Sequence, residues 1–195
     1  MTGLTTTALM GVFLLQGVTL PIAAASDWTV SLEPSYPAYT VRMTGYNAVP
    51  EQTDSTPHIT ASGAYTHSEV VAARSIDLAD ELPFGTVIEI MPKVGTSTPN
   101  CGLGVVQEGI GLRVVADSMH PRKRNQIDIL FDTETKVHAA GKKVNRAIAL
   151  GVCKDVEIRV VGKIDIKDIP ETQNELRLAV GRLERADAQP LALKK

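Results

Sequence analysis

Aromatic residues are scarce in this chain of 195 residues, at 4% of the sequence. This shortage argues against a broad stacking platform for single-stranded nucleic acid or for many sugar rings. The chain also lacks an excess of positive charge, because its formal net charge is -2 and its pI is about 6.1. Without a global basic field, we expect no nucleic-acid partner. The hydrophobic content of 44% is typical of a globular protein.

Several well-known catalytic and binding motifs are missing as well. The sequence has no glycine-rich phosphate loop, no nucleophile elbow and no Cys-His arrangement. The histidines are scattered, and neither they nor the cysteines have the spacing of metal ligands, so we expect no metal and no cofactor. The histidines are His58, His67, His120 and His138.

The first 25 residues contain no charged side chain. The Ala23-Ala24-Ala25 triplet before Ser26 fits a signal-peptide cleavage site, although no Lys or Arg precedes the apolar run. The alternatives are an uncleaved membrane anchor and a misassigned start or buried helix. We therefore expect an exported protein of the periplasm, cell envelope or extracellular space, with membrane contact only through an uncleaved segment 1–25.

Two cysteines, Cys101 and Cys153, can pair fully in an exported chain. A disulfide between them is one interpretation, and two unrelated buried thiols are the other.

Short strand patterns dominate the middle of the chain. β-Branched and alternating runs predict six strands, at residues 39–46, 70–73, 87–91, 114–117, 127–131 and 156–161. Apolar residues recurring at three and four predict helices over residues 133–150 and 171–186. Because βαβ alternation is absent, we expect a mainly β fold. It is a small six-stranded closed barrel with one inserted helix and a C-terminal amphipathic helix.

Four segments follow from these patterns. They are a signal peptide or anchor at 1–25, a linker at 26–38, the barrel domain at 39–163 and a helical tail at 164–195.

Two aspartates, Asp117 and Asp128, lie within apolar runs joined by the basic loop His120–Arg124. Strand alternation places Asp128 on one face with Leu130 and its other apolar neighbours on the opposite face. If two carboxylates are held close, one pKa rises and that group becomes a candidate general acid near neutral pH. The alternative is a loop in which the basic residues neutralise both aspartates.

Seven short motifs occur in a recognisable order. They are Thr44-Gly45-Tyr46, Thr60-Ala61-Ser62-Gly63, Val70-Val71-Ala72, Leu82-Pro83-Phe84-Gly85-Thr86, Val114-Val115-Ala116-Asp117-Ser118, Ile127-Asp128-Ile129 and Leu150-Gly151-Val152. With 11 positions between the aspartates (128 − 117), the set resembles the three-aspartate (3D) domain, a double-psi β-barrel of bacterial cell-wall proteins. That family includes the barrel of membrane-bound lytic transglycosylase A and muralytic proteins of the stationary-phase and resuscitation type.

The resemblance implies a lytic transglycosylase, which cleaves the MurNAc-GlcNAc bond of peptidoglycan strands and leaves a 1,6-anhydro product. Asp128 matches the family's catalytic aspartate and Asp117 its supporting partner. Tyr46, Thr60 and Ser62 would line the glycan groove. By position, His120 is a further candidate for substrate contact.

The chain departs from the family pattern at two places. Ser118-Met119-His120 follows Asp117, where the family has Thr-Gly-Gly. The family's earliest aspartate is replaced by Arg74 in a direct alignment, and Asp77 or Asp80 takes its role only after an insertion. The alternative function is a non-catalytic glycan-binding or envelope-structural barrel, with Asp117 and Asp128 paired to Arg122 or Arg124.

Overall fold

The computed structural model describes residues 36–53, 55–91 and 101–188. The expected export segment and all but the last residues of the linker lie outside these ranges. In the described part of the chain, no helix is long and apolar enough to cross a membrane.

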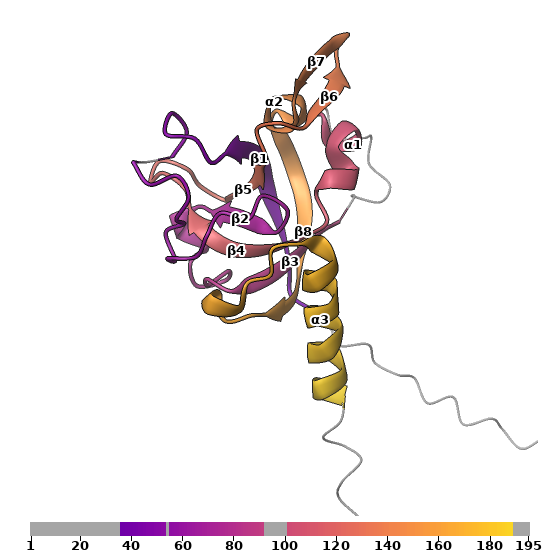
Figure 1. Cartoon of the computed structure of the whole chain (residues 1–195). Coiled ribbons are helices and arrows are strands. Elements are labelled where there is room, and N and C mark those ends of the chain that lie inside the picture. The colour runs from indigo at the N-terminus through magenta and orange to yellow at the C-terminus, as the bar shows by residue number, and fades with distance from the viewer. Residues whose placement is uncertain (1–35, 54, 92–100, 189–195) are drawn as a thin grey trace, which may run out of the picture. The chain divides into compact units, whose positions relative to one another are not determined.

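Six strands form a closed barrel, as the sequence predicts. In barrel order they are β1 (Ala38–Asn47), β5 (Gln126–Phe131), β2 (Val71–Arg74), β4 (Leu112–Ser118), β3 (Thr86–Met91) and β8 (Cys153–Lys163) (Figure 1). The pairs β1–β5 and β2–β4 are parallel, whereas the other four pairs are antiparallel. The fold is therefore mainly β, and its barrel is mixed.

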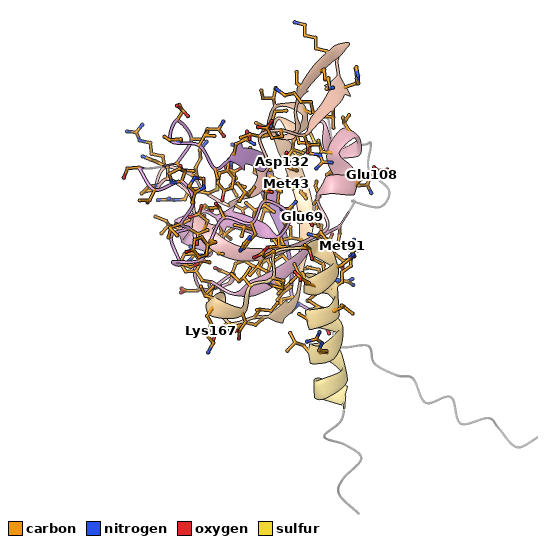
Figure 2. The ribbon with its side chains drawn as sticks, in the orientation of Figure 1. Met43, Glu69, Met91, Glu108, Asp132 and Lys167 are labelled. Atoms are coloured by element: carbon orange, nitrogen blue, oxygen red, sulfur yellow. A yellow bond between two sulfur atoms is a disulfide. The ribbon has the colours of Figure 1, made fainter. Side chains whose placement is uncertain are left out.

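The strands alternate between two apolar clusters. On β5, Ile127, Ile129 and Phe131 join one cluster, while Leu130 joins the other. Met43 of β1 is fully buried in the first cluster (Figure 2). This period of two follows from strand geometry, and it leaves Asp128 on the face opposite Ile127 and Ile129.

The predicted C-terminal amphipathic helix is confirmed as α3 (Gln173–Ala188). Leu176 and Val180 are buried in the second cluster, and the helix contacts β4 and β8.

The described part of the chain also contains three short 3-10 helices. They are η1 (Ile76–Leu78), η2 (Gln107–Gly109) and η3 (Ile166–Asp168).

The predicted inserted helix over residues 133–150 is wrong. The segment forms a hairpin of β6 (Lys136–Ala139) and β7 (Lys142–Asn145), followed by the five-residue helix α2 (Arg146–Leu150). Ala140 and Gly141 both have positive φ, 48° and 75°, which is the backbone of a tight hairpin turn. Val137 and Val144, which suggested a helical stripe, are cross-strand partners instead.

The turn before β3 has the geometry that its sequence indicates. Gly85 has a φ of 91°, which an L side chain rarely adopts. A Cβ at this position would also meet the carbonyl oxygen of Ile164. Glycine is therefore required there, because the closing end of β8 packs directly against the turn.

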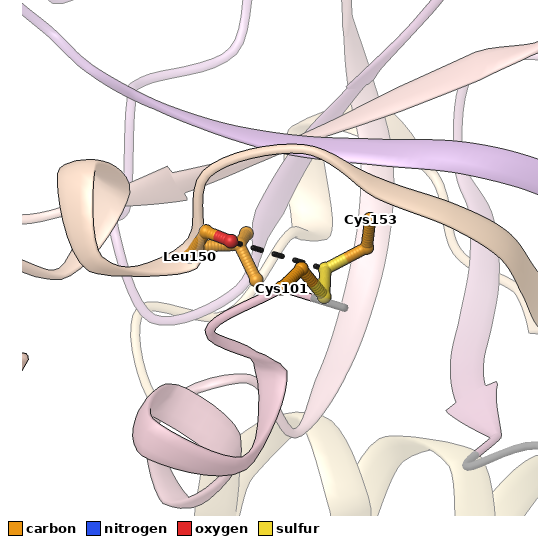
Figure 3. Close-up of a disulfide and its surroundings, with 3 residues drawn as sticks. All are labelled: Cys101, Leu150 and Cys153. Atoms are coloured by element: carbon orange, nitrogen blue, oxygen red, sulfur yellow. Dashed lines mark hydrogen bonds between the residues drawn. A yellow bond between two sulfur atoms is a disulfide. The ribbon is translucent and has the colours of Figure 1, made fainter. Parts of the chain in front are cut away.

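Cys101 and Cys153 are joined by a disulfide, with their Cα atoms 5.2 Å apart (Figure 3). The bridge connects the segment leading into α1 (Leu103–Val106) with the first residue of β8. It therefore fixes α1, which also contacts α2, to the end of the barrel.

Arg113 of β4 is the largest fully buried side chain of the described residues. Its guanidinium donates to five backbone carbonyl oxygens at 2.6 to 3.4 Å, those of Ser68, Val71, Gly109, Ile110 and Leu130. Burial lowers its pKa to about 9, so it remains charged at neutral pH. Carbonyl dipoles satisfy this cation, and it forms no ion pair within the described ranges.

Candidate active site

Asp117 and Asp128 come together across a third strand. Their strands, β4 and β5, are not direct neighbours, because β2 lies between them. Ala73 of β2 is the register partner of both aspartates, Asp117 on one side and Asp128 on the other. Ala73 lines the same groove as the two aspartates.

A groove of about 490 Å³ covers this part of the barrel. Both carboxyl groups lie in its wall, together with hydroxyl, apolar and basic side chains. The lining residues are Tyr46, Gln52, Thr53, Thr56, Pro57, Ile59, Thr60, Ala61, Ala73, Asp117, Ser118, Met119, His120, Lys123 and Asp128.

Asp117 is anchored by three hydrogen bonds. Its Oδ1 accepts from the backbone N–H groups of Ala61 and Ser118, at 2.9 and 2.8 Å, and its Oδ2 accepts from the Tyr46 hydroxyl at 2.9 Å. Burial and the adjacent Asp117 raise the pKa of Tyr46 well above its ordinary value, so the phenol keeps its proton and remains a donor. These donors stabilise the charged carboxylate and hold it in one orientation.

Asp128 has a different environment. Among the described residues its carboxyl group has one hydrogen-bond donor, the Thr44 hydroxyl, which lies 2.8 Å from Oδ1. Burial raises the pKa of Asp128 to about 6, and the charge of Asp117 adds to this, while Thr44 and Lys123 act in the opposite direction. At neutral pH this carboxyl group can therefore both give and accept a proton, which is the requirement for a general acid-base catalyst.

The two arginines of the basic loop between β4 and β5, Arg122 and Arg124, form no ion pair with either aspartate in the described part of the chain. Arg124 donates to the carbonyl oxygens of Pro121 and Lys123 within its own loop. The pairing required by the alternative of a salt-bridged loop is thus not formed among the described residues.

The remaining predicted site residues fall into two groups. Tyr46, Thr60 and His120 line the groove, whereas Ser62 is not among the lining residues. Thr60 is only 5% exposed, and its hydroxyl is bonded to Ala64 and Ser62 inside the turn. This turn helps to hold the Asp117 carboxyl group in place, because the backbone N–H of Ala61 donates to Asp117.

Asp77 lies outside the groove lining. Its Oδ2 accepts from the backbone N–H of Asn125 at 2.9 Å, so it holds the end of the basic loop. Arg74, which the resemblance aligns with the earliest aspartate, is buried and donates to the carbonyl oxygen of Leu82 at 2.7 Å. Of the candidate aspartates, the groove lining therefore contains two, Asp117 and Asp128.

No protein-family model matches this chain, and no curated protein matches it. The assignment of chemistry to the groove consequently depends on its geometry and on the raised pKa of Asp128.

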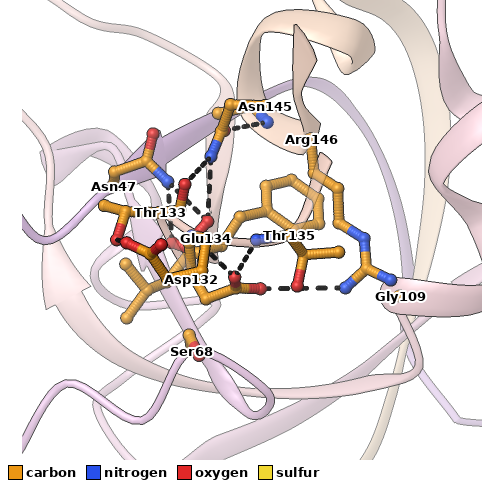
Figure 4. Close-up of polar contacts among 12 residues, drawn as sticks. Asn47, Ser68, Gly109, Asp132, Thr133, Glu134, Thr135, Asn145 and Arg146 are labelled. Carbon is orange, nitrogen blue, oxygen red and sulfur yellow. Dashed lines mark hydrogen bonds and ion pairs between the residues drawn. The ribbon is translucent and has the colours of Figure 1, made fainter. Parts of the chain in front are cut away.

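A second hollow, of about 390 Å³, is also lined by acidic residues, and the hydrogen bonds to its aspartate, Asp132, differ from those to Asp128. Oδ1 of Asp132 accepts from the backbone N–H groups of Glu134 and Thr135, and Oδ2 lies 3.9 Å from Nη1 of Arg146 (Figure 4). Burial opposes ionisation here, but these hydrogen bonds outweigh it and lower the pKa of Asp132. A carboxylate held in this way is a structural anion.

Two residues that are linked to Asp128 by hydrogen bonds, and that lie outside the groove lining, were missed by the sequence reasoning as individual participants. Gln126, which is 2% exposed, donates from Nε2 to the Thr44 hydroxyl at 2.8 Å. Thr44 in turn is the register partner of Asp128 on β1. The available signal was the spacing of two between Gln126 and Asp128, which puts both on one face of β5.

Proposed function

We propose that this chain is an exported peptidoglycan-cleaving enzyme of the lytic transglycosylase type, built on a double-psi β-barrel. The observation that carries the proposal is Asp128, a groove-lining carboxyl group with a pKa of about 6 and no ion-pair partner among the described residues. The motif order and the two parallel strand pairs of the closed barrel support the family assignment.

The reaction needs one carboxyl group in two protonation states. Protonated Asp128 gives its proton to the oxygen of the MurNAc-GlcNAc bond as the bond to C1 breaks. The resulting carboxylate then accepts the proton of the muramoyl C6 hydroxyl, and O6 bonds to C1 to close the 1,6-anhydro ring. The proton returns to Asp128, no water is consumed, and the sugar supplies its own nucleophile.

Asp117 has a supporting role in this scheme. Three donors fix its carboxylate, and its negative charge is one of the causes of the raised pKa of Asp128. A fixed anion beside the reacting sugar also stabilises positive charge that develops at C1 in the transition state.

The test is product analysis by mass spectrometry after the full chain is incubated with purified peptidoglycan in H₂¹⁸O. We expect anhydromuropeptides without ¹⁸O from the wild-type protein. Asp128→Asn should reduce the yield about 10²–10⁴-fold, the usual contribution of general acid-base catalysis. Asp168→Asn, a change at an exposed aspartate outside the groove lining, serves as the matched control and should have no effect.

Three outcomes would contradict the proposal. They are no anhydro product from the wild type, unchanged product from Asp128→Asn, and ¹⁸O-labelled reducing ends, which indicate hydrolysis. Retention on peptidoglycan without any product would favour the non-catalytic glycan-binding or envelope-structural barrel instead.

A further inference from the structure

Three side chains of β1 and β5 form a directional chain of hydrogen bonds that ends on Asp128. Gln126 Nε2 donates to Thr44 Oγ1, and Thr44 Oγ1 donates to Asp128 Oδ1, each at 2.8 Å. The parallel register of the two strands makes Thr44 the direct partner of Asp128 (Figure 1). Gln126 is two positions before Asp128, on the same face of β5.

The direction of this chain follows from the number of protons available. An amide nitrogen can only donate, so Thr44 Oγ1 is the acceptor in its contact with Gln126. The hydroxyl has a single proton of its own, and that proton is free to point at Asp128. Oδ1 of Asp128 accepts this bond, and a proton on Oδ1 would break or reverse it, so protonation of Oδ1 costs a hydrogen bond that protonation of Oδ2 does not.

The two oxygens of the carboxyl group are thereby made unequal. Among the described residues, no hydrogen bond is formed to Oδ2 of Asp128. A proton that binds the carboxyl group goes to the oxygen that is not already accepting one.

We propose that Thr44 and Gln126 are positioning residues that place the transferable proton of Asp128 on Oδ2. This inference rests on the proposed function, because it specifies which oxygen of Asp128 exchanges a proton with the substrate. Gln126 orients the Thr44 hydroxyl, and Thr44 occupies Oδ1, so proton donation and proton acceptance use one fixed oxygen. Neither residue needs to contact the substrate.

The test compares matched variants of the full chain by two readouts. Thr44→Val keeps the shape of the side chain and removes the hydroxyl, whereas Thr44→Ser keeps the hydroxyl. Thr86→Val is the control, because Thr86 is also buried and its hydroxyl donates to the carbonyl oxygen of Pro83, away from the groove lining. The first readout is the pKa of Asp128, measured from the pH dependence of the ¹³C chemical shift of its carboxyl carbon. The second is the pH profile of anhydro-product formation.

We expect Thr44→Val to raise the pKa of Asp128 by about one pH unit, since a carboxylate loses one charge-assisted hydrogen bond. The alkaline limb of the pH-activity profile should move to higher pH by the same amount. Thr44→Ser and Thr86→Val should leave both readouts at wild-type values. Gln126→Met should shift them in the same direction as Thr44→Val but by less, because the hydroxyl remains and only its orientation is lost.

An unchanged Asp128 pKa in Thr44→Val, or a Thr44→Ser variant that behaves like Thr44→Val, would overturn the inference. The NMR readout does not require catalysis. If the wild type makes no anhydro product but Thr44→Val still shifts the pKa, the proposed function fails and the proton placement stands. If product forms and the pKa does not move, the placement alone is wrong.

Discussion

Arg113 and Asp128 each bring an ionisable group into the barrel wall, on strands that are separated only by β2. The guanidinium of Arg113 is fully buried and donates to five carbonyl oxygens. The carboxyl group of Asp128 lies at a groove and, among the described residues, accepts one hydrogen bond. Burial lowers the pKa of Arg113 only to about 9, so this group stays charged at neutral pH, whereas burial raises the pKa of Asp128 to about 6, so that group can change its protonation near neutral pH.

The largest effect is expected at Arg113. Arg113→Met preserves much of the side-chain volume but leaves five carbonyl oxygens without this donor, three of them in buried contacts. We expect the free energy of unfolding to fall by about 3–5 kcal/mol, as measured by urea denaturation. Arg177→Met, at an exposed cation on α3, should stay within about 0.5 kcal/mol of the wild type. Equal effects of the two changes would show that the hydrogen bonds from Arg113 to these carbonyl oxygens contribute nothing to stability.

The two aspartates of the groove should respond to amidation with opposite signs at pH 8. The difference between the pKa of Asp128, about 6, and the ordinary 3.8 corresponds to about 3 kcal/mol. Because the folded-state pKa is raised, the stabilising contribution of Asp128 is complete below pH 3.8 and is lost as pH rises through about 6. Asp128→Asn should therefore stabilise the fold by up to about 3 kcal/mol at pH 8, and this gain should vanish near pH 4.

Asp117→Asn is the matched change, and it should destabilise the fold by about 1–2 kcal/mol at pH 8, since three charge-assisted hydrogen bonds are weakened. Urea denaturation at pH 4, 6 and 8 measures both variants. A shift of the same sign for both at pH 8 would mean that the number of donors does not distinguish the two carboxyl groups.

The smallest effect is expected at Lys123, whose charge lowers the pKa of Asp128 from the exposed loop. Lys123→Gln should raise that pKa by about 0.3 pH unit at low ionic strength, and 0.5 M NaCl should remove most of the difference. ¹³C NMR titration measures the shift, with Lys163→Gln as the control. A salt-independent shift would indicate that the loop has moved, because direct charge interaction is screened.

Local sequence patterns were sufficient for the six barrel strands and for the face on which Asp128 lies, because β-branching and a period of two are properties of the strand itself. They were insufficient for residues 133–150, where Val137 and Val144 fit a helical stripe and a cross-strand pair equally well. The turn at Ala140 and Gly141 decides between these structures, and its positive φ angles belong to the hairpin.

The contacts that differentiate the two aspartates could not be read from local patterns. Thr44 and Asp128 are 84 positions apart, and Ala61 and Asp117 are 56 positions apart. Such pairs meet only through strand order, which places β2 between β4 and β5 and β1 beside β5. The sequence could therefore indicate a pair of acids, but the hydrogen-bond donors of each carboxyl group are known only from the three-dimensional fold.

The closure of the barrel by β1 and β8 also determines when the molecule can fold. These strands begin at Ala38 and end at Lys163, and residues of β1 pair with residues of β8 more than 100 positions later. A nascent chain lacking β8 has two open sheet edges and no complete hydrophobic interior. Folding is consequently a late event in the life of the chain, governed by long-range contacts that form slowly.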